Sequence, residues 1–180
     1  MSPIFQTAPS PPEPWLRGTL ANVPAVPRAV LHALELAKED IERWCAGLTG
    51  EELQTRPSGL PPVAFHLRHI ARSLDRLLTY AEGRQLASAQ LEALHAELDA
   101  PVSRSELFAE LAHALDHAAA RIRALASSDL SELRAVGQKR LPSTLGGLLV
   151  HVADHTQRHV GQSITTAKII VAARTGGPPE

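Results

Sequence analysis

Apolar residues recur along most of the chain at intervals of three and four, which is the spacing of one face of an α-helix. The first such stripe consists of Val30, Leu34, Ala37, Ile41, Trp44 and Leu48. Pro27 suits the first turn of a helix, and Gly47 or Gly50 is suited to its end. The pattern therefore predicts a long first helix that begins near residue 27.

A second stripe follows Pro61 and Pro62 and stops before Gly83. Its members are Val63, Leu67, Ile70, Leu74, Leu77, Leu78 and Ala81. Their period predicts a second long helix. Residues 88–98 carry a weaker pattern, which predicts a short connecting helix before Pro101.

Ser103 and Glu106 have the spacing of a capping box, which predicts that a third helix begins there. Its apolar face consists of Leu107, Leu111, Leu115, Ala118, Ile122 and Leu125. Residues 127–142 follow, with Gly137 and Pro142 as helix breakers. We expect this segment to be a loop.

The fourth helix should follow Ser143 or Thr144 as its cap and continue to about Ala173. Four amphipathic helices without an alternating strand pattern indicate an all-α protein. The predicted architecture is an up-down four-helix bundle.

The N-terminal residues differ from this pattern because they are rich in proline. Residues 1–26 contain six of the fourteen prolines, and proline cannot occupy a helix interior without breaking it. We therefore expect an irregular arm over 1–26, the bundle over 27–173 and a flexible tail over 174–180. The arm either docks through Trp15 and Leu16 or is disordered and has no role.

Composition limits the classes of function. Of the 180 residues, 44% are hydrophobic but only 3% are aromatic, so the core must consist mainly of Leu, Ala, Val and Ile. A net charge of −1 predicts neither nucleic acid nor an anionic membrane as partner. No apolar run reaches the roughly 18 residues of a membrane span, and we expect no signal peptide because no apolar segment of the signal-peptide type follows Met1. Cys45 is the only cysteine, which excludes an internal disulfide and fits the cytoplasm.

Histidines are the candidate chemical groups. His151, His155 and His159 follow one another at intervals of four on the predicted fourth helix. With Val152 as the centre of the apolar face, His159 lies about 20° from the centre, His155 about 60° and His151 about 100°. Two imidazoles at positions i and i+4 can bind one divalent ion, and burying them is costly unless their nitrogens have partners. His155 and His159 are therefore candidate metal ligands, and His151 is expected to be peripheral.

A second pair, His113 and His117, has the same spacing on the predicted third helix. These residues fall at about 200° and 240° from Leu111, the centre of that helix's apolar face. We therefore expect them to face solvent and do not assign a site to them. His32 and His95 are interpreted as ordinary surface or hydrogen-bonded core residues.

A third ligand must come from another helix. On the predicted second helix, with Val63 as centre, His66 lies about 60° from the centre and His69 about 120°. The helical wheel favours His66, but a site at the edge of a bundle could equally use His69. The residues alone leave both alternatives open.

Two short motifs resemble the DinB/YfiT-like superfamily: His69-Ile70-Ala71, and the string from His155 to Gln162. The resemblance covers about residues 28–172. Members of this superfamily are four-helix bundles, often homodimeric, with a divalent-metal site made of three histidines. The resemblance implies that His69, His155 and His159 bind the metal. Many members have arginine before the glycine of the second motif, where this chain has Val160.

The resemblance also implies a function. Some relatives are metal-dependent hydrolases, and others transfer or isomerise groups with low-molecular-weight thiols. We therefore expect a Zn, Ni, Fe or Mn ion and a small-molecule substrate or thiol partner. No catalytic residue is identified, because Asp154 lies about 160° from the apolar face. The alternative is a non-catalytic metal-binding bundle with a role in stress responses.

Overall fold

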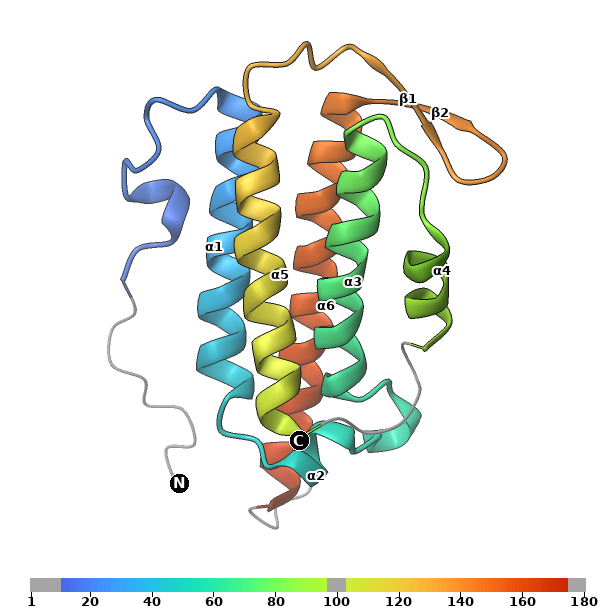
Figure 1. Ribbon diagram of the computed structural model, residues 1–180. Helices are drawn as coiled ribbons and strands as arrows, with labels where there is room; N and C mark the ends of the chain where they lie inside the picture. The colour runs from blue at the N-terminus through green and yellow to red at the C-terminus, as the bar shows by residue number, and fades with distance from the viewer. Residues whose placement is uncertain (1–10, 97–102, 175–180) are drawn as a thin grey trace.

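The computed structural model describes residues 11–96 and 103–174, and in these ranges the chain is mostly helical, as predicted (Figure 1). Four of its helices are long and lie side by side. They are α1 (Ala25–Cys45), α3 (Val63–Ala81), α5 (Arg104–Ala124) and α6 (Leu145–Arg174). None of the described helices is both long enough and apolar enough to cross a membrane.

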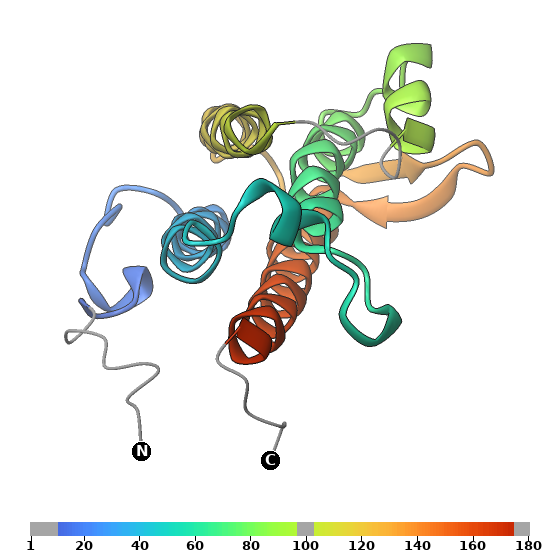
Figure 2. The same cartoon turned by 90° about the horizontal axis from the view of Figure 1, so that it is seen from below.

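Viewed along the helix axes, α1 and α3 each contact both α5 and α6 (Figure 2). Helices α1 and α6 run in one direction, and α3 and α5 run in the opposite direction (Figure 1). A simple alternation of up and down helices is therefore not confirmed. The reason is the short helix α4 (Ser88–His95), through which the chain turns back beside α3 before α5 begins.

Local capping signals in the sequence correspond to the observed helix starts. In α5, the Ser103 side chain accepts a hydrogen bond from the backbone N–H of Glu106, while the Glu106 side chain accepts one from the backbone of Ser103. In α6, the Thr144 hydroxyl oxygen accepts a hydrogen bond from the Gly147 N–H at 3.0 Å. These bonds satisfy amide groups that have no partner within the helix. A shorter helix, α2 (Gly50–Gln54), has the same kind of capping box at its start.

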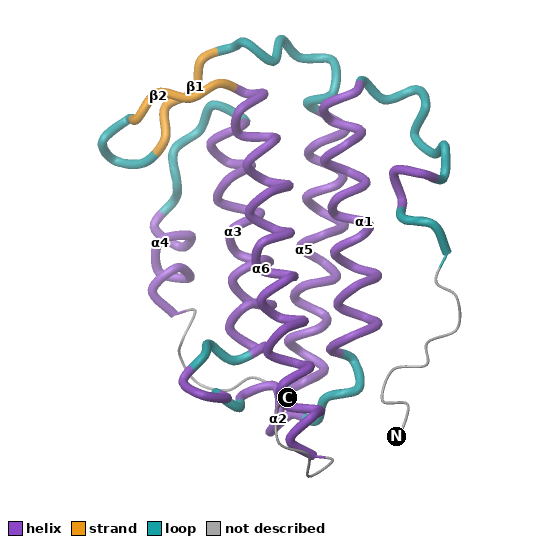
Figure 3. Tube along the Cα trace, turned by 180° about the vertical axis from the view of Figure 1, so that it is seen from behind, coloured by secondary structure: helices purple, strands orange, loops and turns teal. Residues whose placement is uncertain are grey.

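The prediction of a loop over 127–142 is wrong in part. An antiparallel hairpin forms there from β1 (Leu133–Val136) and β2 (Leu141–Thr144). Each strand has only four residues, and β2 contains a proline, so the hydrophobic alternation typical of a strand is not visible in the sequence. From behind, the hairpin and α4 lie on the same side of the molecule (Figure 3). The Arg134 guanidinium ties the hairpin to α3 by donating to the carbonyl oxygen of Ala81 at 2.6 Å.

The described part of the N-terminal arm lies against α1 (Figure 1). Docking through Trp15 and Leu16 is a wrong prediction, because these side chains are 61% and 58% exposed. Pro14 is buried instead, and Arg17 binds the Glu39 carboxylate with two hydrogen bonds of 2.6 and 2.7 Å. Residues 1–10 of the predicted arm and 175–180 of the predicted tail lie outside the described residues.

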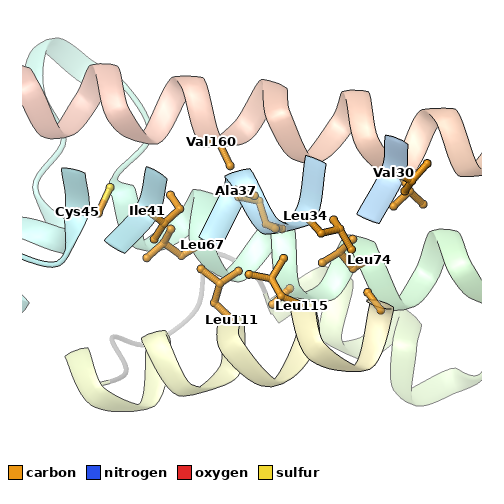
Figure 4. Packing of buried hydrophobic residues seen from close by; sticks show 14 of the residues in the cluster. Val30, Leu34, Ala37, Ile41, Cys45, Leu67, Leu74, Leu111, Leu115 and Val160 are labelled. Atoms are coloured by element: carbon orange, nitrogen blue, oxygen red, sulfur yellow. The ribbon is translucent and has the colours of Figure 1, made fainter. Parts of the chain in front are cut away.

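The core lies between the four long helices and is mainly aliphatic. Figure 4 shows side chains from these helices meeting there, with Val160 of α6 pointing into the core. Val160 is 1% exposed. Burying such a side chain contributes on the order of 1.5–3 kcal/mol, which favours the orientation of α6 that turns Val160 towards the core. Its neighbour His159 is therefore held at the edge of the core, on the side that faces α3.

Candidate metal centre

Helices α3 and α6 bring three histidines together. His69 comes from α3, and His155 and His159 lie one turn apart on α6. The ring centre of His69 is 5.1 Å from that of His155 and 4.3 Å from that of His159. One ring nitrogen from each residue lies within 4.8 Å of the others. All three side chains are half-buried.

The local sequence explains why these rings converge. His155 and His159 keep the same orientation because α6 is continuous and successive i, i+4 side chains lie above one another. Val152 and Val160, both buried, hold this face of α6 against the rest of the bundle. On α3, Ile70 is fully buried, which leaves the preceding His69 at the lateral edge nearest α6.

The spacing of the nitrogens fits a metal ion. Two nitrogens bound tetrahedrally at about 2.1 Å from one ion lie roughly 3.4 Å apart. The Nε2 atoms of His69 and His155 are separated by 3.4 Å. A nitrogen of His159 also lies within 4.8 Å of a nitrogen of each of the other two histidines.

The charge states of His155 and His159 also fit a metal site. Burial, and next the proximity of His69, lower the pKa values of His155 and His159 to about 4. Both imidazoles are therefore neutral at pH 7, and a neutral imidazole carries the lone pair that binds a metal. Protonating such closely spaced rings would bring like charges together in a partly buried site.

His155 provides a separate observation. Its Nδ1 atom is buried and has no hydrogen-bond partner among the residues the structure describes. A buried polar atom without a protein partner is uncommon, and an ordered water molecule is a usual explanation. The donor set and the spacing of its nitrogens are what fit a divalent metal ion.

His66, the other candidate third ligand, occupies a different position. It is 3% exposed and lies next to His159, with 3.1 Å between the Nδ1 atoms of the two rings. The group of potential ligands within 4.8 Å of one another contains His69 and not His66. Burial, followed by the proximity of His69, lowers the pKa of His66 to about 4.

The remaining candidates do not belong to the group of potential ligands, although the ring centre of His151 lies 5.4 Å from that of His155. Nδ1 of His151 is 2.9 Å from Oδ1 of Asp154, and Oδ2 of Asp154 is 3.5 Å from the Arg158 guanidinium. Asp154 is exposed, as the helical wheel predicts. Gln162, also exposed, lines a cavity of about 430 Å³ that includes His66 and Arg158.

Two other expectations concern histidines outside the cluster. His113 and His117 are exposed, which confirms their predicted orientation. His32 is buried, although it lies opposite the apolar stripe of α1, because the N-terminal arm covers it. Its Nε2 atom is 3.1 Å from the hydroxyl oxygen of Thr19, so it is a hydrogen-bonded core residue.

Phe65 is a site neighbour that the sequence reasoning missed. Its ring stacks on His69 with 5.4 Å between ring centres and an interplanar angle of 23°. The signal was available, because residues 65 and 69 are separated by four positions on one helix. Phe65 covers one side of His69 and limits the access of water to it.

Comparison with known proteins adds the family. No curated protein sequence matches this chain. The family model of the DinB superfamily matches residues 33–163, which is more than half of the chain and contains all three clustered histidines. The chain therefore belongs to the DinB superfamily.

Proposed function

We propose that the protein binds a divalent metal ion through His69, His155 and His159 and uses it to act on a small molecule. The reaction is either a hydrolysis or the transfer of a group to a low-molecular-weight thiol. The observation that supports this function best is the convergence of three imidazole nitrogens from two helices within 4.8 Å of one another. Membership of the DinB superfamily supports it independently.

The donor set decides what chemistry the ion supplies. Three protein ligands leave at least one further coordination position, which is the arrangement of a catalytic rather than a closed structural site. When bound there, a divalent ion acts as a Lewis acid that activates water or a thiol at neutral pH. Imidazole ligands suit Zn, Ni, Fe and Mn, so the donor set selects none of these metals.

The chain's own residues keep this site ready to bind. The low pKa values of His155 and His159 keep both rings neutral at pH 7, so little proton competition opposes metal binding. Phe65 shields one side of His69. Because all three ligands are half-buried rather than fully buried, a small substrate has access from the solvent side.

A non-catalytic metal-binding role has one observation in its favour. Among the described residues, the cluster contains only histidines, without a carboxylate or thiol that could transfer a proton. The single thiol, Cys45, is buried on α1, and burial raises its pKa to about 12. In this alternative the ion serves to join α3 to α6.

The test begins with metal analysis of protein purified without a histidine tag. We expect about one divalent ion per chain in the wild type and none in His159→Ala. The metal-loaded protein is then assayed with activated esters, and with a thiol together with a small electrophile. Activity that disappears in His159→Ala supports the proposal that the protein is a metal-dependent enzyme.

Three results would decide against parts of the proposal. Wild-type protein without stoichiometric metal overturns the site. Activity that survives His159→Ala overturns its catalytic use. Metal-dependent heat stability without any turnover favours the non-catalytic alternative.

The family resemblance also leads us to propose a homodimer, which light scattering tests.

A further inference from the structure

His66 contacts a proposed metal ligand without belonging to the ligand group. It lies on α3 one turn before His69, and its side chain is 3% exposed. Its ring centre is 5.3 Å from that of His159, and the two Nδ1 atoms are 3.1 Å apart. This distance is that of a hydrogen bond between the rings.

The hydrogen bond restricts the protonation pattern of both rings. In a neutral imidazole, one nitrogen carries a hydrogen and the other carries a lone pair. Since Nδ1 of His159 is engaged by His66, Nε2 is the nitrogen left to bind a metal ion, and it must carry the lone pair. The hydrogen of His159 then resides on Nδ1 and is donated to Nδ1 of His66.

The opposite arrangement would block metal binding. If His66 donated the hydrogen, Nδ1 of His159 would accept it, and the hydrogen of His159 would reside on Nε2. That nitrogen would then have no lone pair for the ion. Metal binding and this contact are therefore compatible in one direction of the hydrogen bond only.

The surroundings of His66 hold its ring in place. The side chain is almost completely buried, so neighbouring residues surround its ring and restrict its rotation. The ring of Phe65 meets it edge-on, with 5.2 Å between ring centres. A ring fixed in this way can orient the more exposed ring of His159.

We propose that His66 is a positioning residue for the metal centre, which accepts a hydrogen bond from Nδ1–H of His159 and so keeps Nε2 of His159 available to the ion. This inference rests on the proposed metal-binding function. Ligand histidines commonly donate their second N–H to a carboxylate, a carbonyl or water, and such partners orient the ligand. Here a neutral imidazole takes that place, so the contact orients the ring without adding negative charge.

The first test uses the metal-free wild-type protein. Long-range ¹H–¹⁵N NMR spectra of histidine distinguish the two neutral tautomers. We expect His159 to carry its hydrogen on Nδ1, and His66 to carry its hydrogen on Nε2. A wild-type His159 that carries its hydrogen on Nε2 would overturn the inference, and this result requires no variant to fold.

The second test compares two substitutions at the same position by calorimetric Zn²⁺ titration. His66→Phe keeps a ring but removes the acceptor, and we expect the metal affinity to fall about 10- to 100-fold. His66→Asn places an amide oxygen near the position of Nδ1, and we expect it to recover most of this loss. His113→Phe, on the exposed face of α5, is the matched control and should bind like the wild type.

The outcomes separate this inference from the function on which it rests. A wild type that binds no Zn²⁺ overturns the proposed function together with the role of His66. Equal affinities in the wild type and a folded His66→Phe overturn the role of His66 and leave the metal site intact. Equal losses in His66→Phe and His66→Asn also count against it, because an amide acceptor should restore the orientation of His159.

Discussion

Two helices of this protein carry the same motif, two histidines separated by four positions, with opposite structural results. On α5, the rings of His113 and His117 stack with 6.0 Å between centres, and both side chains are exposed. On α6, the ring centres of His155 and His159 lie 4.7 Å apart at the edge of the core. Only the α6 pair meets a third histidine, His69, within 4.8 Å.

The comparison shows that spacing along one helix does not by itself bring two histidines together with a third donor. Both pairs have the geometry that lets two imidazoles approach one ion. The difference is the surface that each pair faces. The α5 pair faces solvent, whereas the α6 pair faces α3, where burial keeps the rings neutral and a further donor is available.

The largest expected difference is in metal affinity. His155→Ala removes one of three proposed ligands, and its effect should exceed the 10- to 100-fold typical of a partner outside the coordination shell, reaching more than about 100-fold. His113→Ala, the matched change on α5, should leave the affinity unchanged. Calorimetric titration with Zn²⁺ measures both. Equal affinities of the two variants would remove the distinction between the pairs.

The next largest effect concerns stability. An ion that binds only the folded state stabilises it by about 2.7 kcal/mol when its free concentration is 100 times Kd. For a chain of this size, that corresponds to a rise in Tm of roughly 5–10 °C. Calorimetry with and without a chelator measures the rise, and His113→Ala should retain it. A similar rise in a doubly substituted His155→Ala/His159→Ala protein would indicate that the ion binds elsewhere.

The metal-free protein should also depend on pH. His155 and His159 have pKa values of about 4 in the folded state, below the ordinary value of 6.5. Between these values the unfolded chain binds more protons than the folded one, so the free energy of unfolding falls as pH decreases from about 6.5 towards 4. This contribution is fully present above that window.

Urea unfolding at pH 7 and pH 5 measures the change. His155→Gln should show a smaller loss between the two pH values than the wild type does, because it removes one of the groups that resist protonation. A loss of the same size in His155→Gln would assign the pH dependence to other groups.

The smallest effect is expected for the solvent-facing pair. His113→Ala/His117→Ala changes two exposed side chains on α5, and such surface substitutions usually alter the free energy of unfolding by no more than about 0.5 kcal/mol. Thermal unfolding of the metal-free protein measures it. A much larger loss would show that the α5 pair contributes to the fold, which would weaken the contrast between the two helices.

Much of the fold was predictable because helical periodicity is a local property. The stripes on α1, α3, α5 and α6 identified the long helices, and the capping residues Ser103 and Thr144 located two of their starts. The hairpin over β1 and β2 was missed because four-residue strands carry too little alternation. The directions of the helices were not predictable either, since the return of the chain through α4 depends on how the elements pack.

For the site, the helical wheel separated the α6 pair from the α5 pair but could not choose between His66 and His69. Wheel angles measure the distance from one helix's own apolar face. They do not say which neighbouring helix covers the flank. In the structure, the lateral position of His69 faces α6, while the more buried His66 contacts His159 from beside the cluster.

The sequence by itself determined which residues share a helix face, where the long helices begin, and that His155 and His159 point in one direction. These are consequences of the helical repeat and of hydrogen bonds between near neighbours in the chain. Only the tertiary structure decided that His69 completes the cluster, that His66 contacts His159, and that the arm covers His32. Each of these contacts joins segments that are distant in sequence, and such contacts depend on how the helices and the arm pack together.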